Sequence, residues 1–441
     1  MKKLFEYVLI ISMISSFYAC SNDIIPDDED VQPEYEDETS PPPKTIELTT
    51  RQSEIVNIGN YFAFNIFREV STAAAEPNTF FSPLSLNLAL GMLYNGASGV
   101  TRTEMAEVLG MADFTDLEFN EYYQKMIKAL LEIDPLTEIG IGNSIWYRDG
   151  FSVKQPFIDL NRDYFDAEVQ ALNFNRPDAA KIINAWCAEK TKDRIKEIVD
   201  DPICDEVVMC LINALYFKSK WKYEFDKADT KPDDFVKADN QKVKANMMEQ
   251  TQVMSYYADK HLQCVELPYG YDSSIESGLT YAQDGKPYSN EAFSMVVILP
   301  ADDMGIDGII DYMDETVWQN IIEKLSYQNV KLKLPRFKIE CTIPLNEPIK
   351  NAGMTRIFQG GFDNISDISL QVSNILQKTF VEVNEEGTEA AAVTSIAFVT
   401  AVIDTPPQPV SFFANRPFLY VIKERSTGAI LFIGRMDEPK E

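Results

Sequence analysis

Only one histidine, His261, is present among the 441 residues. A Ser/His/Asp or Cys/His nucleophile system would have to use it, but its neighbours Asp259 and Lys260 are typical of a solvated surface segment. The chain also has no His-Glu-x-x-His, no nucleophile elbow, no phosphate-binding glycine loop and no dinucleotide fingerprint. We therefore expect a protein that is not an enzyme and that uses neither a cofactor nor a metal.

The segment between Glu385 and Pro409 has an unusual composition, because it contains no lysine or arginine. Every second residue from position 388 is small or apolar, in the set Thr388, Ala390, Ala392, Thr394, Ile396 and Phe398. This period of two predicts a strand with one buried face. Three prolines after Asp404 nevertheless prevent the end of the segment from joining a central sheet. A segment that can form a strand but is held as a loop stores a conformational change.

The composition describes the body that must carry this loop. The hydrophobic share of 45% and the aromatic share of 11% are enough for a large core, and the mean hydropathy of -0.19 excludes a polytopic membrane protein. The formal net charge of -29 repels phosphate backbones and anionic lipid heads. We expect no nucleic-acid partner.

The cysteines do not form a disulfide pattern. Five are scattered over the body in addition to Cys20, at Cys187, Cys204, Cys210, Cys264 and Cys341. An odd number at irregular spacing is typical of small core residues, and a local bridge between Cys204 and Cys210 is the alternative.

The first 46 residues predict export and attachment to a membrane. Residues 1–19 have Lys2 and Lys3 before an apolar stretch that is too short to span a bilayer, as in a signal peptide. The sequence Phe-Tyr-Ala-Cys at 17–20 resembles a loose lipoprotein processing box, which predicts lipid on Cys20; an ordinary signal with a spare cysteine is the alternative. Residues 20–46 contain nine acids and three consecutive prolines, which predict a flexible tether. The expected location is a bacterial cell envelope, as an outer-membrane or surface lipoprotein, or secretion.

Residues 47–441 contain no linker, and we expect one α+β domain. Helical spacing dominates the first half, and Thr101 with Glu104 predicts a capping box. Residues 207–217 predict a strand covered on both faces, and the alternation at 330–334 predicts a half-exposed strand. Residues 418–422 and 429–433 predict a hairpin. The Gly- and Ser-containing segment 269–289 predicts a surface insertion.

Several segments together resemble the serpin family. Residues 412–422, Phe-Phe-Ala-Asn-Arg-Pro-Phe-Leu-Tyr-Val-Ile, fit the family's carboxyl-terminal signature at every position. Residues 78–85 resemble the buried region called the shutter, and residues 211–221 resemble the strand that leads to the region called the breach. The resemblance implies these shutter and breach residues: Ser82, Ser85, Asn213, Gln377 and Trp221. Gln377 stands where animal members often have histidine.

The resemblance implies a single metastable domain with three β-sheets, eight or nine helices and an exposed reactive loop at about 385–409. It implies a hinge made of Glu385, Gly387, Thr388, Ala390, Ala391 and Ala392, in which Thr388 is the first side chain to turn inward when the loop becomes a strand. The usual loop length places the cleaved bond between Ala401 and Val402, and a bond nearer Asp404 is the alternative, because the loop to Phe418 is about five residues longer than in typical members. The flanking specificity residues are then Val399, Thr400 and Ile403.

The resemblance also implies a function. A protease cleaves the loop, and the acyl-enzyme is trapped when the loop inserts into the main sheet. Small aliphatic residues around Ala401 favour elastase-like serine proteases as partners, with papain-like cysteine proteases as a second class, and we expect a monomer. Two alternatives stay open at this point: a serpin-fold carrier or chaperone that does not inhibit, and an envelope adhesin.

Overall fold

The structure is a computed structural model, and it describes residues 45–73, 76–134, 137–270, 291–388 and 408–441. The predicted signal peptide, Cys20 and nearly all of the tether therefore lie outside the described residues. Ile46, at the end of the predicted tether, is already buried and donates its backbone N–H to Ser426 Oγ at 2.9 Å. In the described residues no helix is long and apolar enough to cross a membrane.

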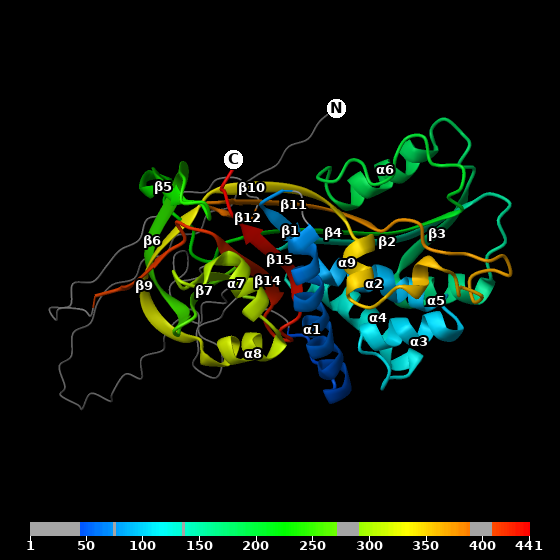
Figure 1. Cartoon of the computed structure of the whole chain (residues 1–441), viewed down its shortest axis with the longest axis horizontal. Helices are drawn as coiled ribbons and strands as arrows, with labels where there is room; N and C mark the ends of the chain where they lie inside the picture. Colours follow the sequence, from blue (N-terminus) through cyan, green and yellow to red (C-terminus); the bar gives the residue numbers. More distant parts are fainter. Residues whose placement is uncertain (1–44, 74–75, 135–136, 271–290, 389–407) are drawn as a thin grey trace, which may run out of the picture. The chain divides into compact units, whose positions relative to one another are not determined.

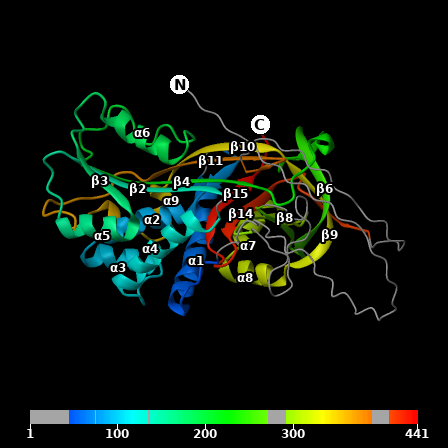
Figure 2. The same cartoon turned by 180° about the vertical axis from the view of Figure 1, so that it is seen from behind.

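One sheet contains six strands in the order β10-β11-β12-β4-β2-β3. Its strands are β2 (Glu138–Arg148), β3 (Ala167–Leu172), β4 (Met209–Lys220), β10 (Phe337–Pro344), β11 (Leu376–Asn384) and β12 (Gly387–Thr388). Figure 1 shows helix α6 (Ala179–Lys190) on one face of this sheet and α2 (Pro83–Tyr94), α4 (Asp116–Glu132) and α5 (Gln155–Phe165) on the other. Helix α6 covers only part of its face, as in the view from behind (Figure 2), and every second residue of β10 stays exposed.

The other nine strands form one connected network. They are β1 (Thr79–Phe81), β5 (Lys231–Val236), β6 (Lys242–Ala258), β7 (Leu262–Pro268), β8 (Phe293–Pro300), β9 (Ser326–Pro335), β13 (Val410–Phe413), β14 (Phe418–Glu424) and β15 (Ile430–Met436). The long strand β6 pairs with β5 over residues 242–247, with β9 over residues 247–256 and with β7 over residues 255–258. Two of the three expected sheets are therefore continuous through β6, and the α+β fold is confirmed.

The described residues contain nine α-helices, within the expected number. The five not yet given are α1 (Thr50–Ala73), α3 (Gly99–Val108), α7 (Gly305–Tyr312), α8 (Glu315–Lys324) and α9 (Asn346–Asn351). In α4 the residues at steps of four, three and four, from Phe119 to Leu130, are all buried, which confirms the helical spacing.

The predicted capping box at Thr101 is wrong. Helix α3 begins at Gly99, and the Thr101 hydroxyl donates to the backbone oxygen of Gly360 at 2.8 Å. The capping box is in α4, where Thr115 Oγ accepts from Glu118 N at 3.2 Å and the Glu118 carboxylate accepts from Thr115 N at 2.8 Å.

The strand predictions are confirmed in most of their length. Val330, Leu332 and Leu334 of β9 are buried, and β14 pairs with β15 as the predicted hairpin. Strand β4 begins at Met209, two residues later than expected, and is covered on both faces only from Ala214 to Phe217.

Two smaller expectations are corrected. Tyr269, the first residue of the predicted surface insertion, is fully buried and does not belong to one. Residues 271–290 lie outside the described ranges. Cys204 is exposed, while Cys187, Cys264 and Cys341 are core residues, and none of the five body cysteines is in a disulfide.

Candidate functional site

The short strand β12 lies between β4 and β11 and is antiparallel to both. Thr388 stands opposite Ser219 on β4 and opposite Val383 on β11. Because neighbouring strands are about 4.8 Å apart, β4 and β11 are separated here by two strand spacings, about 10 Å. Thr388, the last described residue before the loop, thus lies between these two strands.

We call the direction from Thr388 toward Met209 of β4 and Leu376 of β11 downward. Below Thr388 in this sense, the facing edges of β4 and β11 pair with no other described strand. We call these edges, residues 209–218 and 376–382, the seam. Six residues down from Ser219 and Val383 are Asn213 and Gln377, which therefore stand level on the two sides of the seam. At about 3.3 Å per residue, this level lies about 20 Å from Thr388.

Two buried carboxylates form the turn that leads into β12. Glu385 is 2% exposed, and its carboxylate accepts from Thr230 Oγ at 2.5 Å and from Arg336 Nε at 2.7 Å. Glu386 pairs with Lys227, although one of its carboxylate oxygens is buried without a hydrogen-bond partner. Burial raises the pKa of Glu385, but the hydrogen bonds from Arg336 and Thr230 lower it by more, so this pKa lies below its ordinary value.

Gly387 can only be a glycine in this turn. Its φ is 153°, and a Cβ would lie 2.2 Å from the backbone oxygen of Ser219. The backbone around it is fixed by Trp221, whose N–H donates to the oxygen of Glu386 and whose indole N–H donates to the oxygen of Asn384, both at 2.9 Å. The start of the loop is therefore held firmly in the sheet.

Thr388 is already inside the sheet, which corrects the expectation that it turns inward only after cleavage. Its side chain is 2% exposed, and its hydroxyl lies 2.7 Å from the hydroxyl of Tyr269. Tyr269 stacks on Trp221 with ring centroids 4.6 Å apart. Burial raises the pKa of Tyr269 strongly, so its hydroxyl stays neutral beside Thr388.

Three of the predicted shutter residues are brought together. The backbone N–H of Ser82 donates to Gln377 Oε1 at 2.8 Å, and Gln377 Nε2 donates to the oxygen of Ser82 at 2.9 Å. Ser82 Oγ donates to the oxygen of Leu431 and accepts from Ser85 N at 3.1 Å, which caps α2. Gln377 thus closes a network that joins β11 to the helix beneath it.

Asn213, the fourth predicted shutter residue, lies on the other side of the seam and is only half-buried. Its Nδ2 donates to Asn143 Oδ1 at 2.7 Å, and Asn143 donates in turn to the oxygen of Phe165. The Oδ1 atom of Asn213 is buried without a partner among the described residues. An unsatisfied buried acceptor costs about 1–3 kcal/mol, so a donor that entered the seam here would be stabilised.

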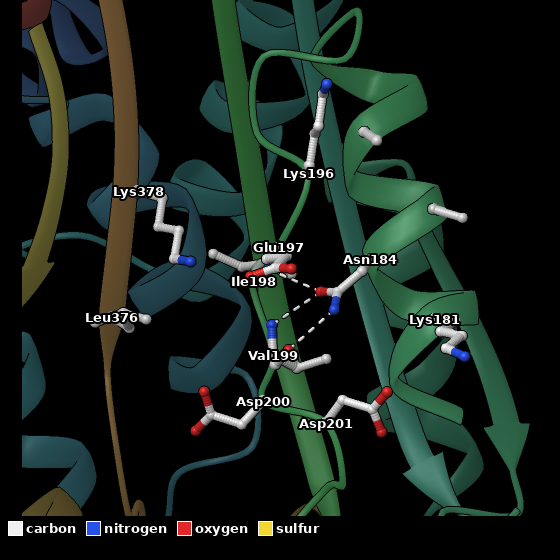
Figure 3. A pocket seen from close by; sticks show the side chains of 12 residues that line it. Lys181, Asn184, Lys196, Glu197, Ile198, Val199, Asp200, Asp201, Leu376 and Lys378 are labelled. Atoms are coloured by element: carbon white, nitrogen blue, oxygen red, sulfur yellow. Dashed lines mark hydrogen bonds between the residues drawn. The ribbon is translucent and has the colours of Figure 1, made fainter. Parts of the chain in front are cut away.

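A cavity of about 470 Å³ lies over the lower end of the seam (Figure 3). Lys378 and Leu376 of β11 line one side of it, and α6 with residues 196–201 lines the other. Asn184 of α6 holds this segment through the backbone of Ile198 and Val199, at 2.7 and 3.0 Å.

The remaining predicted site residues lie outside the described ranges. They are Ala390, Ala391, Ala392, Val399, Thr400, Ala401, Val402, Ile403 and Cys20. Sequence reasoning missed Thr230, Arg336, Tyr269 and Asn143, because each contacts a residue far away in the chain. No local pattern links Arg336 to Glu385, for example, because the two residues are 49 positions apart in the chain.

Replacing Glu385 by glutamine should destabilise the folded protein by about 1–3 kcal/mol at pH 7, because charge-assisted bonds to Arg336 are lost. The folded pKa of Glu385 lies below its unfolded value, so its contribution is present above the unfolded pKa, about 4.3, and disappears as pH falls through the folded pKa. Urea unfolding midpoints at pH 7 and pH 3 measure this difference. Glu382→Gln, on the half-exposed face of β11, is the matched control; an equal loss in both variants would contradict the assignment.

Comparisons with known proteins agree with this geometry. The family model described as Serpin (serine protease inhibitor) matches residues 57–439. An uncharacterized serpin-like protein of Thermococcus kodakarensis is 31% identical over 396 residues, which are 89% of this chain and 87% of that protein.

Two solved structures show the same fold. The thermophilic serpin tengpin in its native state is 28% identical, with a TM-score of 0.77 over 90% of this chain and 97% of that one. Thyroxine-binding globulin in complex with thyroxine is 25% identical, with a TM-score of 0.75 over 88% of this chain and all of the other. The chain therefore belongs to the serpin family, whose members are typically protease inhibitors.

Proposed function

We propose that this serpin inhibits proteases as a suicide substrate. The observation that carries the proposal is the position of β12, whose Thr388 already pairs with both β4 and β11 while the seam below it is unpaired among the described strands. After cleavage, the chain that follows Thr388 can extend this strand downward. New pairing and burial then drive the change, with each buried apolar side chain contributing about 1–3 kcal/mol.

The register of β12 says which loop residue would meet which partner. Continued from Thr388, it places Ala390 between Phe217 and Val381, both of which are buried. The same register places Thr394 between Asn213 and Gln377. The Thr394 hydroxyl would be a donor for the unpartnered Oδ1 of Asn213, so the inserted strand would complete the polar network of the seam.

The trapped species is an ester. The protease serine attacks the carbonyl carbon of Ala401, the bond to Val402 breaks, and the new amino group leaves with a proton. Water would normally hydrolyse the ester, and insertion must be faster. Val399, Thr400 and Ile403 are small or aliphatic, which favours elastase-like serine proteases, with papain-like cysteine proteases as a second class.

Incubation with a pancreatic-type elastase should give a covalent complex that survives boiling in detergent, together with a released peptide that begins at Val402. A trypsin-type protease should give neither product, because lysine and arginine are absent from the loop. Rapid turnover without a complex would refute inhibition and favour a carrier. A peptide that begins after Pro406 would refute the position of the cleaved bond.

We propose that the chain has no catalytic activity of its own. The ring of His261 packs against Tyr312, with centroids 4.6 Å apart. Asp259 accepts from the backbone N–H of His261 and from Leu262, so in the described residues it does not orient the imidazole as a triad would require.

We also propose attachment to the envelope through lipid on Cys20, on the strength of the Ala19-Cys20 junction after an apolar signal. The mature protein should begin at acylated Cys20 and partition into detergent, whereas Cys20→Ala should leave the membrane fraction. Recovery of that variant unchanged in the membrane would refute lipidation.

A further inference from the structure

One lysine at the lower end of the seam has no partner. Lys378 of β11 is half-buried, and among the described residues it forms neither an ion pair nor a hydrogen bond. Every other half-buried lysine that the structure describes pairs with a carboxylate, except Lys125, which donates to Gln52 Oε1 at 3.2 Å. A half-buried ammonium without a partner favours an anion beside it.

The ammonium of Lys378 is directed toward the cavity between β11 and α6. Figure 3 shows its side chain pointing from β11 toward the segment 196–201. Its charge also acts on Cys187 of α6, which is 1% exposed: burial raises the pKa of this thiol to about 12, and Lys378 opposes the rise. The positive charge of Lys378 therefore lies on the cavity side of β11, close to α6.

The rest of the cavity combines apolar walls with a solvated rim. Its apolar side chains are Ala185, Ala188, Ile198, Val199 and Leu376. The other charged residues that line it, two lysines and three carboxylates, are all exposed. The volume of about 470 Å³ is within the range of about 300–1,000 Å³ that is common for small-molecule sites.

We propose that this cavity binds a small amphiphile with a carboxylate head, such as a medium-chain fatty acid. The head would pair with Lys378, and the alkyl chain would lie against the apolar walls. The three carboxylates at the rim are exposed, so water weakens their repulsion of the head. The net charge of -29 repels anions from the surface in general, so binding of a fatty acid should depend strongly on Lys378.

A ligand in the cavity would also oppose insertion of the reactive loop, and this part of the inference rests on the proposed function. The register of β12 places Val393 beside Lys378 and Ser395 beside Leu376, on the outer face of the sheet. The inserted strand would therefore pass directly beneath the cavity. A ligand that bridges β11 and the segment 196–201 would stabilise the uncleaved arrangement of this region.

The first measurement is calorimetric binding of decanoate to the uncleaved full-length chain without protease. The parent should bind decanoate at one site, whereas decyltrimethylammonium, which has the same alkyl chain and a positive head, should not bind. Lys378→Gln should weaken decanoate binding about tenfold or more, because a charge-assisted contact is lost. Lys378→Arg should keep the binding, and Lys196→Gln at the exposed rim should stay within about twofold of the parent.

A second variant makes the test independent of the folding of Lys378→Gln. Ala185→Phe narrows the cavity without changing its charge, and it should also weaken the binding of decanoate. Equal binding by the parent and Lys378→Gln, or no binding by the parent, would overturn the site.

The second measurement is the number of inhibitor molecules consumed per pancreatic-type elastase. Saturating decanoate should raise this number about twofold or more in the parent, because the ligand stabilises the uncleaved arrangement. The same addition should leave the number unchanged in Lys378→Gln. Binding without this rise would overturn the control of insertion and leave the site standing. A parent that traps no protease would overturn the proposed function, while the binding measurement still decides the site.

Discussion

Replacing Ala390 by arginine should turn the protein from an inhibitor into a substrate. The register of β12 places residue 390 between Phe217 and Val381, which are 6% and 1% exposed. Insertion would bury a guanidinium without a partner, which costs several kcal/mol. If about 3 kcal/mol of this cost raises the activation free energy of insertion, insertion slows about 150-fold. Hydrolysis of the acyl-enzyme is then faster than insertion.

The measurement is the fraction of protease captured in a detergent-resistant complex at equal concentrations. Glu389→Arg is the control, because the same register places it opposite Lys218 and Glu382 on the half-exposed face. That variant should keep most of the inhibition. Thr388 is not suitable for this test, since it is buried in β12 before cleavage and a change there would disturb the uncleaved fold. Equal capture by the Ala390→Arg variant and the parent would mean that insertion is not the working step.

Cleavage in the loop should make the protein much more stable. The inserted strand would satisfy both edges of the seam, bury the alternate residues from Ala390 and give Asn213 Oδ1 a donor. We expect the midpoint of thermal unfolding to rise by roughly 15 °C or more. Calorimetry before and after cleavage near Ala401 measures the shift. The cleaved Ala390→Arg variant should gain much less, and a parent without any gain would show that the uncleaved fold is not metastable.

The sequence was sufficient for the family and for the parts of the fold that depend on local pattern. The alternation of apolar and polar residues predicted strand β9, and two apolar runs around a turn predicted the hairpin of β14 and β15. Both predictions are confirmed. The capping box shows the limit of such patterns. Thr101 and Thr115 have the same spacing to a glutamate, but the Thr101 hydroxyl bonds to Gly360, which no local rule foresees.

The candidate site depends still more on distant contacts. The resemblance to the serpin family implied a hinge around Gly387, but it did not show that Thr388 is already in the sheet. That position is fixed by Tyr269, which is 119 residues away in the chain and looked like part of a surface insertion. Likewise, Glu385 was expected only as a hinge residue, and the sequence did not predict its contacts with Arg336 and Thr230. The pairs of residues that meet at the seam come from the sheet register, which the sequence alone does not determine.

The most direct test of loop insertion is the structure of the full chain after cleavage in the reactive loop. We predict a new strand that continues β12 through the seam, with Ala390 between Phe217 and Val381 and with Thr394 beside both Asn213 and Gln377. A cleaved structure in which the chain after Thr388 stays outside the sheet, and in which β4 and β11 are joined only through β12, would contradict it.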